Sequence, residues 1–241
     1  MNVNNYIKEL PKEIWNLKNL RRLYLRYNKI KNLPKEIGKL ISLKKLYLSH
    51  NQIERLPKEI GNLKNLEELY LDFNKLKELP KEIKKLISLK DLYLSHNQLK
   101  ELPEEIIQLK NLETLDLEGN ELQHLPKEID KLKNLEILSL ENNQLLWLPK
   151  EILELSKLKK IRLYNAFDLN NLKQEPEILF NILKTLEEKK TTEEKNILNS
   201  QSLKYLKEKV YPILEKKIKE KYWITNSKQI KDNFNFDNLT F

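Results

Sequence analysis

The chain has no cysteine, and it has only three glycines and three histidines among its 241 residues. Without cysteine there can be no disulfide bridge, no cysteine-ligated metal and no thiol nucleophile. Three glycines are too few for the glycine-rich loops that hold nucleotide phosphates. No hydrophobic run reaches the roughly 18 residues that a transmembrane helix needs. We therefore expect no cofactor, no metal site and no membrane span.

The beginning of the chain lacks the apolar core of an export signal. The segment from Asn5 to Leu17 matches the second half of the repeat described below, while the first half of that repeat is missing. We expect a secreted or cell-surface protein if a signal was removed before Met1, and a cytoplasmic protein if Met1 is the natural start. A first repeat that is naturally shortened would give the same pattern.

Positive charge is in excess, since 45 Lys and Arg oppose 36 Asp and Glu and give a net charge of +9. Such an excess can indicate nucleic-acid binding. Here, however, lysine and glutamate form pairs at one position of a repeat, namely Lys35-Glu36, Lys58-Glu59, Lys81-Glu82, Lys127-Glu128 and Lys150-Glu151. A face of mixed charge is typical of solubility. We therefore expect no nucleic-acid partner.

What the chain has in abundance is leucine at a fixed spacing. A leucine recurs every 23 residues, at Leu20, Leu43, Leu66, Leu89, Leu112, Leu135 and Leu158. The pattern around each is L-x-x-L-x-L-x-x-N-x-L/I-x-x-L-P-x-x-I-x-x-L. A period of this length indicates stacked supersecondary units, each packed only on its neighbours. Such stacks expose a long regular surface, and binding is their usual function.

The residue types within one repeat predict its local structure. The alternation in L-x-L is that of a β-strand, with Leu23 and Leu25 pointing inward and Tyr24 outward, and successive strands form a parallel sheet. The asparagine after each strand is predicted to satisfy buried backbone groups of adjacent coils, because its amide both donates and accepts. This asparagine ladder comprises Asn28, Asn51, Asn74, Asn97, Asn120 and Asn143.

The second half of each repeat is predicted to turn. Pro34 suits the first turn of a helix, and the following K-E-I-x-x-L places Ile37 and Leu40 on one inward face. We therefore expect short helices or 3₁₀ turns on the outer side of the stack.

This pattern resembles the leucine-rich repeat family, in particular its 23-residue type with the L-P-x-x-I signature, over residues 5–163. The Lys- and Asn-rich repeat sequence, as in Leu-Pro-Lys-Glu-Ile-Gly, is similar to that of bacterial members of the family, notably those of pathogenic spirochaetes. The resemblance implies an α/β fold, a right-handed, horseshoe-shaped solenoid whose parallel sheet lines the concave side. It also implies a protein-binding role, often at a host or envelope surface. The missing N-terminal cap and an unrelated tail depart from the family pattern.

The chain divides at the point where the repeat pattern fails. Residues 1–163 are predicted to form the solenoid, with an N-terminal half repeat (1–19), six full repeats (20–157) and a seventh strand (158–163). Residues 164–241 are predicted to form a helical C-terminal cap or tail. Its first helix is expected to begin near Pro176, and Pro212 is expected to kink or split a second one. A break is expected at Thr191–Lys195, and loose docking or poor order from Thr225 to Phe241.

The tail has two interpretations. Its helices can cover the apolar edge that the last strand exposes, as terminal units of solenoids must. Alternatively, four apolar residues at helical spacing can dock on a second copy of the chain and form a homodimer. Those four residues are Leu179, Ile182, Leu183 and Leu186.

The outward strand positions define the candidate binding site. Two aromatic columns are predicted across the first four repeats, with an acidic patch beyond them. The predicted partner-binding residues are Tyr24, Tyr27, Tyr47, His50, Tyr70, Phe73, Tyr93, His96, Asp72, Asp116 and Glu118. Tyr and Phe are enriched at interface hot spots and lose little entropy on binding. Duplication of one ancestral repeat, or the strand propensity of Tyr, would also produce such columns.

The ligand predicted first is a protein or peptide, and a glycan is the second ligand class. No catalytic residue is predicted, and the chain is not expected to be an enzyme. His50 and His96 lie two strands apart, about 9–10 Å, with Phe73 between them, so they cannot share a metal or a proton. Ser49 lies beside Asp72 and His50, but these residues do not follow one another on neighbouring strands in the order that a Ser-His-Asp catalytic arrangement needs.

Overall fold

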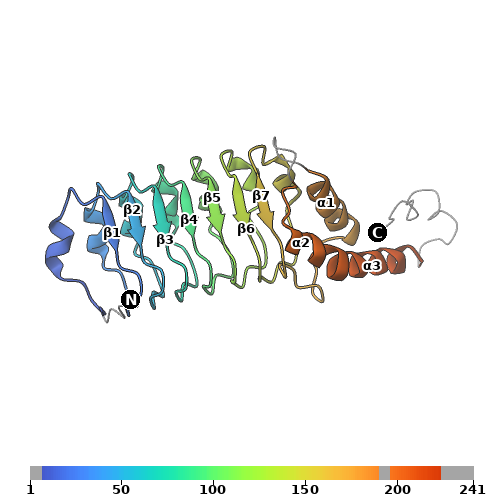
Figure 1. Cartoon of the computed structure of the whole chain (residues 1–241), viewed down its shortest axis with the longest axis horizontal. Helices are drawn as coiled ribbons and strands as arrows, with labels where there is room; N and C mark the ends of the chain where they lie inside the picture. Colours follow the sequence, from blue (N-terminus) through green and yellow to red (C-terminus); the bar gives the residue numbers. More distant parts are fainter. Residues whose placement is uncertain (1–6, 190–195, 224–241) are drawn as a thin grey trace.

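A computed structural model describes residues 7–189 and 196–223 of the chain. Seven parallel strands form one sheet in the order β1 to β7, which is also their order in the sequence. Figure 1 shows the strands side by side along an elongated molecule, with all long helices at the C-terminal end. The strands are β1 (Arg22–Tyr24), β2 (Lys45–Tyr47), β3 (Glu68–Tyr70), β4 (Asp91–Tyr93), β5 (Thr114–Asp116), β6 (Ile137–Ser139) and β7 (Lys160–Arg162).

The strands pair without any shift in register, because each residue lies beside its equivalent 23 positions further on. Leu23 pairs with Leu46, and Tyr24 pairs with Tyr47. The side chain of Leu23 is only 7% exposed, whereas that of Tyr24 is 63% exposed. The predicted inward and outward faces are therefore correct.

Short 3₁₀ turns form the opposite side of the coil. They are η1 (Lys12–Asn16), η2 (Lys35–Lys39), η3 (Lys58–Asn62), η4 (Lys81–Lys85), η5 (Glu104–Gln108), η6 (Ile129–Lys131) and η7 (Lys150–Glu154). Pro34 immediately precedes η2, and Ile37 and Leu40 are fully buried behind it. The predicted fold class, a leucine-rich-repeat type solenoid with a parallel sheet, 3₁₀ turns and a helical cap, is confirmed.

The N-terminal half repeat packs on the first full repeat through its turn. Trp15 in η1 is 3% exposed and belongs to the continuous apolar core. The backbone of Ile7 joins the ladder, because its N–H donates to Oδ1 of Asn28 over 3.0 Å and its carbonyl accepts from the N–H of Lys29 over 2.9 Å. Asn28 thus links the half repeat to the first full coil.

The tail closes the other end of the sheet. Ile197 and Leu198 lie beside β7, and the N–H of Ile161 donates to the carbonyl of Ile197 over 2.8 Å. The hydroxyl of Ser202 accepts from the N–H of Leu163 over 2.8 Å. Because tail residues extend the sheet itself, the division at residue 163 stays a prediction rather than an observed domain boundary.

Within its described residues, the cap contains three α-helices: α1 (Pro176–Glu188), α2 (Ser200–Tyr205) and α3 (Tyr211–Trp223). The first begins at Pro176, as predicted. A single π-helical turn, η8 (Leu206–Val210), joins α2 to α3 just before Pro212. Proline cannot donate a backbone hydrogen bond and its ring crowds the carbonyl four residues earlier, so the chain changes its hydrogen-bond spacing there. The sequence analysis expected a kink or a split at Pro212, and the structure has a π-helical turn just before it.

The structure does not support self-association through the first tail helix. Leu179, Leu183 and Leu186 are fully buried and Ile182 is 3% exposed, all within the core of the same chain. Helix α1 packs against η7 and α3, so its apolar face is already covered. This arrangement agrees with the first interpretation of the tail, in which its helices cover the apolar end of the solenoid. The predicted break at Thr191–Lys195 and the end from Thr225 onward lie outside the described residues.

Candidate functional site

The asparagine ladder fixes the turn at which each strand leaves the sheet. Asn97 is representative: its Nδ2 donates to the carbonyls of Leu71 and Leu94 over 3.0 and 2.9 Å, and its Oδ1 accepts from the N–H of Leu76 over 3.0 Å. Corresponding bonds are made by Asn51, Asn74, Asn120 and Asn143. The ladder therefore holds the residue before each asparagine in one repeated position on the surface.

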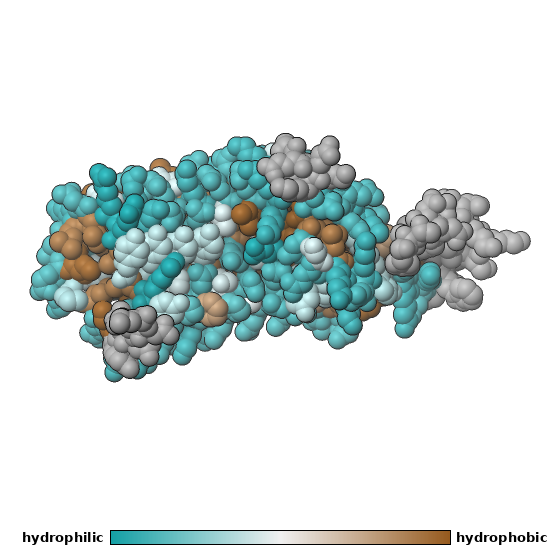
Figure 2. Space-filling view, in the orientation of Figure 1, coloured by the Kyte–Doolittle hydropathy of each residue, from teal (hydrophilic) through white to brown (hydrophobic). Residues whose placement is uncertain are grey.

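The first aromatic column consists of Tyr24, Tyr47, Tyr70 and Tyr93. Their rings stack with centroid distances of 4.5, 4.7 and 4.6 Å. This spacing is close to the distance of about 4.8 Å between strands, so the backbone itself sets the ring separation. Burial beside the neighbouring rings and the nearby Glu68 carboxylate raise the pKa of Tyr70, which keeps its hydroxyl protonated. Figure 2 shows a pale band of intermediate hydropathy across this half of the molecule.

The second aromatic column consists of Tyr27, His50, Phe73 and His96, stacked at 4.3, 4.4 and 4.3 Å. Every residue of this row has a left-handed backbone. The φ angles are 58° for Tyr27, 57° for His50, 54° for Phe73, 52° for His96, 65° for Gly119, 53° for Asn142 and 50° for Asn165. The sequence analysis placed these residues outward but missed their conformation. Gly and Asn at three of the seven positions were the signal that could have revealed it.

Left-handed backbone is costly for most side chains in this row. For residues other than Gly it costs roughly 1–2 kcal/mol, although Asn and His tolerate it better than most. Tyr27 and Phe73 are the least suited, and Phe73 is 44% exposed, so burial does not compensate for it. Backbone strain of this kind is common at functional sites, so an observed outlier is a reason to look for a functional site there.

The strain can be measured with a matched pair of variants. Tyr24 and Tyr27 both lie in the first repeat, are 63% and 55% exposed, and each stacks on one ring of the next repeat. Tyr24→Gly is expected to lower the free energy of unfolding by about 1–2 kcal/mol, through lost strand propensity and added chain entropy. Tyr27→Gly is expected to change it by less than half as much, because glycine relieves the left-handed backbone. Urea denaturation of both variants measures the difference, and equal losses would remove the argument from strain.

A groove of 330 Å³ lies between the two aromatic columns. At its floor, Asp72 accepts hydrogen bonds from the hydroxyls of Ser49 and Ser95 over 3.0 and 2.9 Å and from the N–H of Ser95 over 3.2 Å. The guanidinium carbon of Arg26 lies 4.6 Å from the ring centre of Tyr47 and 4.8 Å from that of Tyr70. The structure thus brings together aromatic walls, an acidic floor and one arginine.

The face becomes acidic beyond the fourth strand. Asp116 follows Tyr93 in the first row, and Glu118 and Glu141 continue the row of Asp72. Burial, together with the negative charges of Asp72 and Glu118, raises the pKa of Asp116. Burial also raises the pKa of Glu141, which is 8% exposed. Loss of water around the carboxylates on burial is the main physical cause of these raised pKa values, and repulsion between the carboxylates adds to it.

Several ion pairs link neighbouring strands at the start of the strands. Lys44 Nζ lies 2.6 Å from Glu67 Oε1, and Lys45 pairs with Glu68 in the same way. These pairs follow the 23-residue spacing, and each joins a lysine of one repeat to a glutamate of the next. Lys45 and Glu68 therefore neutralise each other beside the first aromatic column.

The histidines of the second aromatic column are kept apart by an aromatic ring. Phe73 stands between His50 and His96, with ring centroids 4.4 and 4.3 Å away. Nε2 of His96 lies 4.0 Å from Glu118 Oε1, and burial lowers the pKa of His50. Among the described residues no group of three His, Asp or Glu side chains could hold a metal ion. Within the same residues no helix is both long and apolar enough to cross a membrane.

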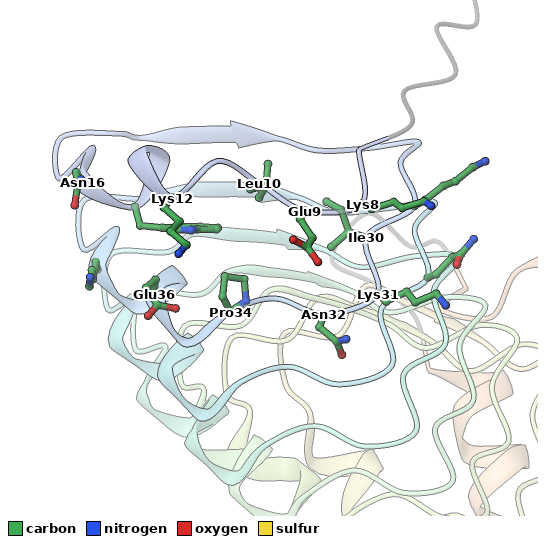
Figure 3. A pocket seen from close by; sticks show the side chains of 14 residues that line it. Lys8, Glu9, Leu10, Lys12, Asn16, Ile30, Lys31, Asn32, Pro34 and Glu36 are labelled. Atoms are coloured by element: carbon green, nitrogen blue, oxygen red, sulfur yellow. The ribbon is translucent and has the colours of Figure 1, made fainter.

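A larger cavity lies at the N-terminal end. It measures 1020 Å³ and is lined mainly by residues of the half repeat and the first full repeat (Figure 3), among them Lys8, Glu9, Lys12, Lys31 and Glu36. Five lysines and two glutamates line it, so its charge is mostly positive. It lies where the N-terminal half repeat meets the first full repeat. We place the candidate site on the groove between the aromatic columns, because the predicted partner-binding residues gather there.

A parallel sheet of 23-residue coils with an internal asparagine ladder and one uncovered face defines a solenoid repeat protein. The family model for the leucine-rich repeat region matches residues 2–78, 35–93 and 77–208, so the chain belongs to the leucine-rich repeat family. A search of curated proteins finds no significant match.

Solved structures of the same fold include bacterial and plant proteins. A leucine-rich repeat protein of Leptospira interrogans is 51% identical over 66% of this chain and 40% of its own, with a TM-score of 0.63. The ectodomain of a membrane receptor kinase from Arabidopsis thaliana, in complex with Casparian Strip Integrity Factor 2, is 34% identical over 65% of this chain and 20% of its own, with a TM-score of 0.58. An internalin from Listeria monocytogenes is 25% identical over 66% and 47%, with a TM-score of 0.57. The matched region spans less than half the length of each of these relatives.

Proposed function

We propose that this protein is a non-catalytic binding module that holds a protein or peptide partner on the sheet face, along the groove between the two aromatic columns. The observation that carries the proposal is the set of aromatic side chains at left-handed positions, where Gly or Asn would cost less. The last three repeats of the row use Gly119, Asn142 and Asn165, so the fold does not require aromatic residues there.

The geometry suits a protein or peptide better than a glycan. Sugars bind aromatic residues through exposed ring faces, but here each inner ring is covered on both faces by its neighbours in the column. What the columns present outward is ring edges and tyrosine hydroxyls. Rigid, half-exposed aromatic residues of this kind are typical anchors of protein interfaces.

The relatives support the same proposal. One is a plant receptor kinase ectodomain in complex with Casparian Strip Integrity Factor 2, and another is a plant peptide hormone receptor in complex with its ligand. The likeness to proteins of Leptospira and Listeria favours a bacterial source. We extend the proposal to a bacterial surface or secreted protein whose partner is a host or envelope protein.

Site-specific photocrosslinking tests the location of the site. A benzophenone amino acid at Tyr93 on the sheet face is compared with the same amino acid at Lys85, which is exposed in η4 on the opposite side of the coil. A partner is expected to crosslink from position 93 and not from position 85. In the purified complex, Tyr93→Ala is expected to weaken binding tenfold or more, since loss of a hot-spot residue costs about 2 kcal/mol, whereas Lys85→Ala is expected to have no effect. Crosslinking from position 85 alone would place the site on the 3₁₀ side instead.

A further inference from the structure

We infer that the groove accepts an arginine side chain of the partner, seated beside Arg26 between Tyr93 and Phe73 and facing Asp116. This inference rests on the proposed function and adds the chemistry of the partner. It is carried by the contents of the groove and by the charge around it.

Arg26 shows that the groove fits a guanidinium group. Its side chain extends from the first repeat along the groove, so its guanidinium carbon lies within 5 Å of the rings of both Tyr47 and Tyr70. Because these two rings stack on each other, the guanidinium lies beside their edges rather than over an open ring face. Aromatic side chains also line the groove beyond Arg26, namely Tyr93 and Phe73. The groove therefore holds a guanidinium at its N-terminal end and has further aromatic edges, beside Asp72 and Asp116, along its length.

The charge of this second position is negative, although the chain as a whole carries a net charge of +9. Asp72 and Asp116 line the groove, and Glu118 follows Asp116 two residues later. The positive groups that face this region are Arg26 at one end and Arg162, which lowers the pKa of Asp116 from the other. Burial and carboxylate repulsion outweigh Arg162, because the pKa of Asp116 is still raised. A further cation would relieve this repulsion.

Arginine fits this region better than lysine does. Its planar guanidinium carries five N–H donors in a fixed arrangement that matches carboxylates, and it stays charged at all physiological pH values. Lysine offers a compact ammonium that holds its water more strongly. The partner is thus expected to be an extended segment or loop with an exposed arginine.

The experiment selects peptides from a random phage-displayed library on the full chain. The best binders are synthesised with arginine or with citrulline, which has nearly the same shape but no charge, and are measured by calorimetry. Arginine is expected at one fixed position, and citrulline there is expected to weaken binding about tenfold, since charge pairs at interfaces contribute about 1.5 kcal/mol or more. In the Asp116→Asn variant, the arginine peptide and the citrulline peptide are expected to bind with the same affinity. Glu54→Gln removes one charge from an exposed loop residue and is expected to leave that difference unchanged.

The outcomes separate this inference from the proposed function. Peptides that lose affinity with Tyr93→Ala but show no preference for arginine would overturn the inference alone. Peptides whose affinity is unaffected by Tyr93→Ala would overturn both. An arginine preference that persists unchanged in Asp116→Asn would also contradict the inference, because the groove would not be its cause.

Discussion

Leu94→Asp is expected to unfold the repeat array cooperatively. Leu94 is fully buried just after β4, and its N–H donates to the carbonyl of Asp116 over 2.8 Å. A carboxylate there has no positive partner inside the stack, and an unpaired buried charge costs several kcal/mol in addition to the lost burial of leucine, which contributes roughly 1.5–3 kcal/mol. Since each repeat is stabilised by its neighbours, the damage spreads in both directions. Far-UV circular dichroism and urea denaturation measure the loss.

The control for this variant is the adjacent residue. Tyr93 faces out of the sheet and stacks on Tyr70 alone, since Asp116 follows it in the row. Tyr93→Ala is therefore expected to leave the melting temperature nearly unchanged. A well-folded Leu94→Asp with a destabilised Tyr93→Ala would mean that the strand register is wrong by one residue, because a shift of one exchanges the two faces.

Asn97→Ala is expected to have the second largest effect. The change removes two donors and one acceptor. The N–H of Leu76 loses its acceptor, whereas the carbonyls of Leu71 and Leu94 keep Asn74 and Asn120 as donors. One buried N–H left unpaired costs about 1–3 kcal/mol, and the two lost bonds to the carbonyls add to this loss of stability. Urea denaturation, with hydrogen exchange at Leu76, measures the loss.

Asn134→Ala is the matched control for the ladder. Asn134 also donates from Nδ2 to a backbone carbonyl of the preceding repeat, that of Lys110, over 2.7 Å, but this bond is exposed to water. Water can replace it, so a loss of well under 1 kcal/mol is expected. Equal losses of stability for the two substitutions would contradict the argument that burial makes the ladder hydrogen bonds costly to remove.

The sequence was a good guide where the repeat controls the structure. The period of 23 residues predicted the parallel sheet, because equivalent residues must lie side by side once each coil is the same length. The inward leucines and outward tyrosines followed from strand alternation alone. The helix start at Pro176 and the disturbance at Pro212 followed from the fixed geometry of proline.

The sequence was a poor guide to the details that depend on contacts between repeats. It placed Phe73 and His50 outward but gave neither their left-handed backbone nor their stacking. It did not reveal that Arg26 extends across Tyr47 to Tyr70, since this contact joins residues of three repeats. It also left the fate of Leu183 open, because an amphipathic helix looks the same whether it covers its own chain or another.

By itself, then, the sequence determined the solenoid, its register and the rows of side chains on its faces, because these depend only on local geometry repeated at a constant interval. Only the tertiary structure decided that α1 covers the end of the stack and that Ile197 and Leu198 extend the sheet. It also decided that the two aromatic columns enclose a groove with Asp72 at its floor and Asp116 at one end. Those features arise from packing between segments far apart in the chain, and no periodic pattern encodes them.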